Sequence, residues 1–211
     1  MSAESLKKWV GFYKPFFPSE RLARDFVVPF EALPLGDPRH PAKIMMHQVQ
    51  RLVSLADDIP SIRKGNETLP LLFLLICVED IAKLCDDFVG EGQSKAYVRN
   101  FFEWFLLPQE QKELCIRITN HEQTSLSLRD AVDMFYDVRC DIVHEGKYWG
   151  FHFQCGATPM MSCDPDVTLS LSLKDFRGVV VRGCIKAIRA YPRKPSTSLN
   201  GDAGKNPART R

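Results

Sequence analysis

Apolar residues recur at the spacing of an α-helix along most of the chain after residue 41. Each such segment has one hydrophobic stripe and one polar face, which predicts an amphipathic helix. We expect helices at about 42–58, 68–88, 94–107 and 109–118, a longer one from Ser125 or Ser127 to just before Gly146, and a last one at about 174–190. The pattern therefore predicts a mainly α-helical fold.

After Gly146 the pattern changes from the period of a helix to that of a strand. Residues 147–154 are rich in aromatic side chains, and residues 167–173 alternate strictly between apolar and polar ones. A segment with glycine and prolines joins them, as in a loop. We predict a two-stranded β-hairpin at about 147–173, inserted between the last two helices, and we expect a loop at the polar residues 119–125.

The two ends of the chain differ from its middle. Residues 1–41 contain six prolines and seven aromatic residues, so we expect only short helices there, around 4–13 and 19–28. This N-terminal arm must pack its aromatic rings on the body or on a partner subunit. Residues 192–211 have few apolar side chains and are predicted to be disordered. The helical domain then covers residues 42–191.

The composition, 45% hydrophobic and 26% charged over 211 residues, is typical of one soluble globular domain. The net charge of +2 is uneven, because the basic tail after Tyr191 carries +4 and the rest carries −2. Overall charge therefore does not indicate nucleic-acid binding, and any RNA site must be a local basic patch. The longest apolar run, Leu69–Val78, is too short to span a membrane, so no membrane association is expected.

Seven cysteines without a C-x2-C pair, in a chain whose N-terminus shows no secretory signal, predict reduced thiols in a cytoplasmic protein. Cys155 and Cys163, with His152 nearby, are conceivable metal ligands, but a hairpin with incidental cysteines is the simpler interpretation. The sequence has no glycine-rich phosphate loop. We therefore expect no metal and no cofactor.

The candidate chemistry lies at the end of the long helix before Gly146, where Arg139 and His144 are five residues apart. Gly146 suits the position just past a helix C-terminus, and the helix dipole there favours a charged His144. Arginine offers a planar, permanently charged fork for phosphate oxygens, and histidine exchanges a proton near neutral pH. The pair is therefore suited to phosphodiester chemistry on RNA. The buried stripe of this helix is predicted to comprise Leu128, Val132, Phe135, Val138 and Ile142.

This Arg-x4-His pattern, with a long helix before it and Glu-Gly after it, resembles the motif of the HEPN superfamily, whose active members are metal-independent endoribonucleases. The resemblance covers about residues 40–191 and is closest to the branch with a strand insertion after the histidine. It implies a helical bundle, catalytic roles for Arg139 and His144, RNA as substrate, and a homodimer whose two motifs face each other. Many active members have a polar residue after the arginine, where this chain has Cys140.

Several residues near the motif are candidates for supporting roles. Glu79, directly after the apolar run, either pairs with Arg139 or faces solvent, and Asp141 lies one turn below His144, where it could orient the ring. The supporting residues that we expect are Asp141, Glu79 and Cys140, and the expected RNA contacts are Lys147 and Tyr148.

The spacing of the motif also raises a geometric problem. Five residues on a regular helix turn about 500°, so Arg139 and His144 point roughly 140° apart. Either the arginine curls back, or the helix unwinds at His144, or the site is assembled from two chains. The family resemblance implies the third solution.

Three functions are compatible with these features. The first is an endoribonuclease, as a toxin or as a stress- or phage-defence effector with a partner antitoxin. The second is a non-catalytic HEPN-like module that binds nucleotide, RNA or protein, with Arg139 in a structural salt bridge and His144 as a helix cap. The third is a metal-dependent enzyme that uses either His152 with its neighbouring cysteines or a row of acidic residues on the motif helix. Without a metal, this acidic row either forms a solvated face or docks a basic partner. That row consists of Asp133, Asp137, Asp141 and Glu145.

Overall fold

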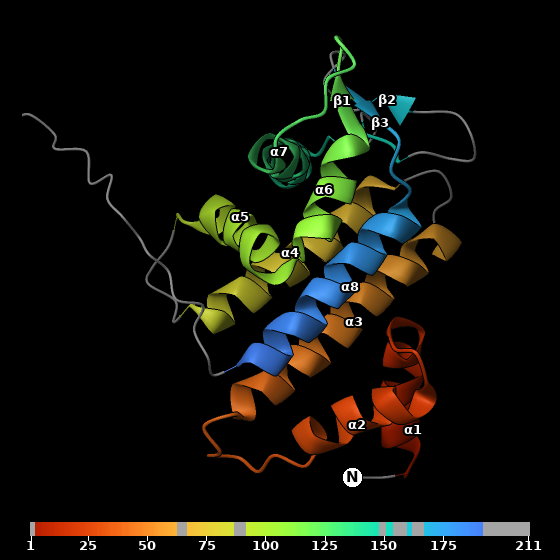
Figure 1. The fold of residues 1–211 in the computed structure, drawn as a ribbon, viewed down its shortest axis with the longest axis vertical. Helices are drawn as coiled ribbons and strands as arrows, with labels where there is room; N and C mark the ends of the chain where they lie inside the picture. Colours follow the sequence, from red (N-terminus) through yellow and green to blue (C-terminus); the bar gives the residue numbers. More distant parts are fainter. Residues whose placement is uncertain are drawn as a thin grey trace, which may run out of the picture.

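The computed structural model describes residues 3–62, 67–86, 92–147, 151–153, 160–161 and 167–191. These residues form eight α-helices, one turn of 3-10 helix and three short strands, so the fold is mainly α-helical, as predicted (Figure 1). The helices are α1 (Ala3–Tyr13), α2 (Glu20–Glu31), α3 (His40–Ile62), α4 (Thr68–Cys85), α5 (Ser94–Phe105), α6 (Pro108–Ile116), α7 (Leu128–Glu145) and α8 (Leu173–Ala190). The 3-10 turn is η1 (Lys14–Phe16), and the strands are β1 (Ile118–Asn120), β2 (Met160–Met161) and β3 (Val167–Leu169).

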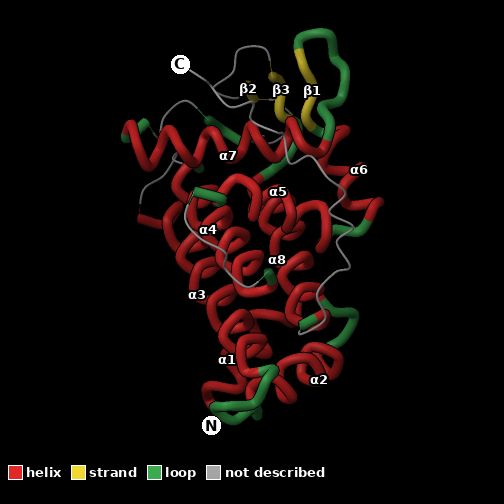
Figure 2. Tube along the Cα trace, turned by 90° about the vertical axis from the view of Figure 1, so that its left-hand side faces the viewer, coloured by secondary structure: helices red, strands yellow, loops and turns green. Residues whose placement is uncertain are grey.

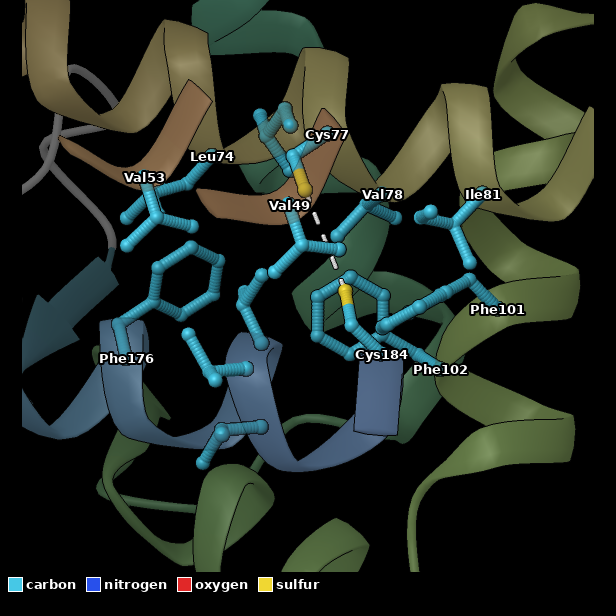
Figure 3. Packing of buried hydrophobic residues seen from close by; sticks show 14 of the residues in the cluster. Val49, Val53, Leu74, Cys77, Val78, Ile81, Phe101, Phe102, Phe176 and Cys184 are labelled. Carbon is cyan, nitrogen blue, oxygen red and sulfur yellow. Dashed lines mark hydrogen bonds between the residues drawn. The ribbon is translucent and has the colours of Figure 1, made fainter. Parts of the chain in front are cut away.

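Helices α3, α4 and α8 run along the length of the molecule and pack side by side (Figure 1). Helix α7 lies across one end of them, beside the small sheet, whereas α1 and α2 lie at the opposite end (Figure 2). One continuous hydrophobic core joins the helices. At its centre the Sγ atoms of Cys77 on α4 and Cys184 on α8 are 4.0 Å apart, among apolar side chains of α3 and α5 (Figure 3).

The sheet is antiparallel with the order β1-β3-β2, so β3 is its central strand. A β2–β3 pair does follow α7, within the predicted range of 147–173. The predicted first strand was wrong, because residues 151–153 are not part of the sheet, and β1 occupies a stretch overlapping the predicted loop at 119–125. Two or three residues are too few to give a recognisable alternation along the sequence.

The start of α4 explains why residues 151–153 do not pair as a strand. The backbone N–H of Phe153 donates to the Glu67 carboxylate at 2.8 Å, and the Thr68 hydroxyl donates to the carbonyl of Phe151 at 3.3 Å. Both phenylalanine rings are fully buried and pack against Phe135 of α7. Helix α4 thus takes backbone groups that a neighbouring strand would otherwise bind.

The N-terminal arm packs on the body of its own chain. Tyr13 is fully buried, and its hydroxyl donates to the carbonyl of Met46 on α3 at 2.7 Å. The Trp9 ring stacks on His47 with 4.2 Å between ring centroids, and the Nε2 atom of His47 is 2.6 Å from the Glu31 carboxylate. Of the two packing partners expected for the arm, these contacts show the body of its own chain.

Some predictions concern residues outside the described ones, namely the tail at 192–211, the candidate RNA contact Tyr148, and Cys155 with Cys163. The five cysteines in the described part of the chain are free thiols. In that same part, none of the helices combines the length and the apolar composition that crossing a membrane requires.

Candidate functional site around α7

Helix α7 begins and ends at the residues that the sequence favoured. The Ser127 side chain accepts a hydrogen bond from the backbone N–H of Asp130 at 3.1 Å, as an N-cap does. At the other end Gly146 has a φ of 65°, in the left-handed region, and its N–H donates to the carbonyl of Asp141. His144 therefore lies in the last turn of the helix. The buried face comprises Ala131, Val132, Phe135, Val138 and Ile142.

Arg139 lies at the edge of this buried face, with only 18% of its side chain exposed. One terminal nitrogen of its guanidinium donates to the Oε2 atom of Glu79 on α4 at 3.3 Å. The same guanidinium lies 5.4 Å from the ring centroid of Tyr136, one turn earlier on α7. The predicted pair of Arg139 and Glu79 is thus present, and it fixes the guanidinium between α4 and α7.

Glu79 connects three helices through one buried carboxylate. Its Oε1 atom accepts hydrogen bonds from the ammonium of Lys83 at 2.5 Å and from the hydroxyl of Ser94 on α5 at 2.6 Å. Burial raises the pKa of this carboxyl, but the bonds from Lys83 and Ser94 and the charges of Lys83 and Arg139 outweigh it, so the pKa lies below its ordinary value. Glu79 is therefore charged at neutral pH.

His144 points away from the core and is exposed. It forms no hydrogen bond or ion pair with any residue that the structure describes. Within one chain the structure thus does not bring His144 and Arg139 together. On a regular helix the arc between them holds Val143, Tyr136 and Cys140, at about 40°, 60° and 100° from Arg139. The Val143 side chain, on the Arg139 side of this arc, is half exposed.

The other expected site residues are distributed around α7. Asp141 is half-buried. Among the described residues its carboxylate makes no hydrogen bond to His144, so no contact supports the expected role of Asp141 in orienting the His144 ring. Cys140 is a half-buried free thiol beside Tyr136, and burial together with this thiol raises the pKa of the Tyr136 phenol. Lys147 is exposed and forms an ion pair with Glu145.

Most carboxylates of the acidic row along α7 form ion pairs with lysine or arginine side chains. The row is therefore not simply a solvated face, which was one of the interpretations of the sequence. The Nε atom of Arg99 on α5 donates to Asp133 at 2.6 Å and a terminal nitrogen donates to its second oxygen, while Lys95 lies 3.0 Å from Asp137. The Arg99 hydrogen bonds hold the pKa of Asp133 below its ordinary value. Within the described residues, no three His, Cys, Asp or Glu side chains are grouped so as to hold a metal ion.

Sequence reasoning identified Arg139 and Glu79 but missed their neighbours. Lys83 lies four residues after Glu79 on one helix, so helical spacing could have revealed this pair. Ser94 and Tyr136 carried no signal, because their roles depend on how α5 and α7 pack against α4. Comparisons of the chain with family models, with curated proteins and with solved structures give no match.

Proposed function

We propose that this protein is an HEPN-type endoribonuclease that cleaves RNA without a metal ion and whose active site is completed by a second copy of the chain. One observation carries the proposal, namely the Arg139–Glu79 pair. A partly buried arginine is held by a charged carboxylate on a neighbouring helix, five residues before an exposed histidine at a capped helix end. This arrangement keeps a cation in a fixed place and leaves the proton-transfer group accessible.

The proposed reaction uses the 2′-hydroxyl of the RNA as the nucleophile. A histidine accepts the proton of this hydroxyl, the 2′-oxygen forms a bond to phosphorus, and the bond to the 5′-oxygen breaks as that oxygen receives a proton. The guanidinium of Arg139 stabilises the extra negative charge on the phosphoryl oxygens. The products carry a 2′,3′-cyclic phosphate and a 5′-hydroxyl, and DNA is not a substrate because it lacks the nucleophile.

A dimer supplies what one chain lacks. The reaction uses a base and an acid, whereas each chain has one His144, turned roughly 140° from its own Arg139. A two-fold axis beside α7 would bring two histidines and two arginines to one phosphate. The strip between them on α7, formed by Tyr136, Cys140 and Val143, is apolar and partly exposed, which suits contact with a second copy.

The test is an RNA cleavage assay with pure protein, with and without EDTA. We expect cleavage that survives EDTA, leaves 2′,3′-cyclic phosphate ends and is abolished in His144→Ala. The matched control is His121→Ala, which removes an exposed histidine outside α7 and should leave cleavage unchanged. Activity that disappears with EDTA and returns with magnesium or zinc would contradict the proposed mechanism.

One observation favours a second function, a module that binds RNA or nucleotide without cleaving it. Arg139 is only 18% exposed and already contacts Glu79 and Tyr136, which limits its access to a phosphate. This alternative predicts that the protein raises the fluorescence anisotropy of a labelled single-stranded RNA and that no cleavage product forms. In that case His144→Ala would weaken binding only slightly.

A further inference from the structure

Helices α1 and α2 lie at the opposite end of the molecule from α7 (Figures 1 and 2). A groove between these two helices is lined by residues of both. Its cavity measures about 540 Å³, a volume in the range of small-molecule sites. The apolar part of its lining comes from Leu6 and Val10 of α1, and Val10 is 6% exposed and belongs to the core. One of the two apolar residues that line the groove therefore belongs to the hydrophobic core.

Gly11, which has no side chain, leaves open space in the lining of this groove. Gly11 lies inside α1 and lines the cavity, and a Cβ atom built on it would meet no other atom within 4 Å. Glycine in a helix interior costs roughly 0.5–1 kcal/mol relative to alanine, so α1 bears a cost that no packing contact explains. The space above Gly11 is therefore free for a ligand.

The rim of the groove is positively charged. Lys7 lies one turn before Gly11 on α1, Lys14 is the first residue of η1, and Arg24 belongs to α2; all three line the groove. The lining contains one acid, Glu20, which is bonded to Lys14 at 2.7 Å. Three cations against one carboxylate leave an excess of two positive charges around an apolar floor.

From this combination we infer that the groove between α1 and α2 binds a small amphiphilic anion, with an apolar chain above Gly11 and a carboxylate or phosphate between Lys7 and Arg24. The cations select an anionic head, and the floor of Leu6 and Val10 selects an apolar body rather than a sugar or a free phosphate. The tail after Tyr191 does not suit this site, because its net charge is +4.

The experiment is isothermal titration calorimetry of the full chain with octanoate, using octyl phosphate, octylammonium and acetate for comparison. We expect octanoate and octyl phosphate to bind with a dissociation constant of about 1 mM or tighter. Octylammonium, which has the wrong charge, and acetate, which has no apolar chain, should bind at least about tenfold more weakly. Binding of octylammonium as tight as that of octanoate would overturn the inference.

Two variants locate the binding. Gly11→Leu places a side chain in the free space and improves helix propensity, so the melting temperature should be unchanged or higher while octanoate binding is lost. Replacing both Lys7 and Arg24 with glutamine should weaken binding about fivefold or more, with the loss growing at low salt.

The matched control is Lys8→Gln on the same helix. Lys8 does not line the groove and lies 5.6 Å from the Trp9 ring centroid, so this variant should bind octanoate like the wild type. Octanoate binding that Gly11→Leu leaves intact would overturn the inference. So would binding to vesicles containing phosphatidylserine in the absence of octanoate binding, since that would indicate a membrane surface as the ligand. Neither result depends on RNA cleavage.

Discussion

At the scale of single residues, the carboxylate of Glu79 determines where Arg139 can be. It receives bonds from Lys83, Ser94 and Arg139, which come from three different helices. A buried charge of this kind is tolerated only when it is paired and hydrogen-bonded. The same contacts hold α4, α5 and α7 together and fix the guanidinium, so the candidate site and the packing of these helices depend on one side chain.

Glu79→Gln should lower the free energy of unfolding by about 2 kcal/mol, because the amide keeps the shape but leaves Lys83 and Arg139 without their charged partner. Urea denaturation measures this change. Glu103→Gln is the matched control, since Glu103 is exposed on α5 and the change there should be within about 0.5 kcal/mol. Equal stability of the two variants would show that Glu79 is not a structural centre.

The pH dependence of the difference in unfolding free energy between wild type and Glu79→Gln tests the charge state of Glu79. Its pKa in the folded protein is lowered, so its charge contributes stability above the unfolded-state value of about 4.3 and loses that contribution as the pH falls through the folded-state pKa. We expect the gap in unfolding free energy between wild type and Glu79→Gln to be constant from about pH 7 to pH 5.5 and to shrink below about pH 4.3. A gap that widens on acidification would contradict this.

At the scale of elements, the caps of α7 show how much the sequence could predict. The sequence predicted its end at Gly146 and its start at Ser125 or Ser127, of which Ser127 is the N-cap, because capping needs only a hydroxyl or a left-handed residue at a fixed position. The strand β1 gave no such signal, since it has only three residues and its pairing with β3 joins segments about fifty residues apart. The helix caps, which depend on neighbouring residues in the sequence, were therefore predictable. The pairing of β1 with β3, which depends on tertiary contacts, was not.

Substitution of two glycines by alanine should have opposite effects on stability. Gly146→Ala should cost about 1 kcal/mol, because an L-residue at a φ of 65° is strained. Gly11→Ala in the interior of α1 should gain roughly 0.5–1 kcal/mol, because nothing opposes the added methyl group. Thermal denaturation of both variants measures this. A stabilising Gly146→Ala would mean that α7 does not end in a left-handed cap.

At the scale of the whole molecule, the N-terminal arm is part of the folded body rather than an appendage. The hydroxyl of Tyr13 is buried against α3, and its bond to the Met46 carbonyl is 2.7 Å long. Tyr13→Phe should therefore lower the free energy of unfolding by about 1 kcal/mol. The matched control is Tyr191→Phe, because the Tyr191 hydroxyl bonds to no described residue. Equal stability of both variants would argue that the arm is loosely packed.

The proposed assembly of two chains rests on the geometry of α7 combined with the proposed reaction. If one site uses two copies of Arg139 and His144, light scattering should give about twice the chain mass of 24.1 kDa. Purified mixed dimers of wild type and His144→Ala should then cleave RNA at much less than half the rate of wild-type dimers, because each lacks either the base or the acid. Independent sites would instead give half the rate. A monomer that cleaves RNA, or mixed dimers at half activity, would exclude the shared site while leaving the chemistry of Arg139 and His144 within one chain to be tested.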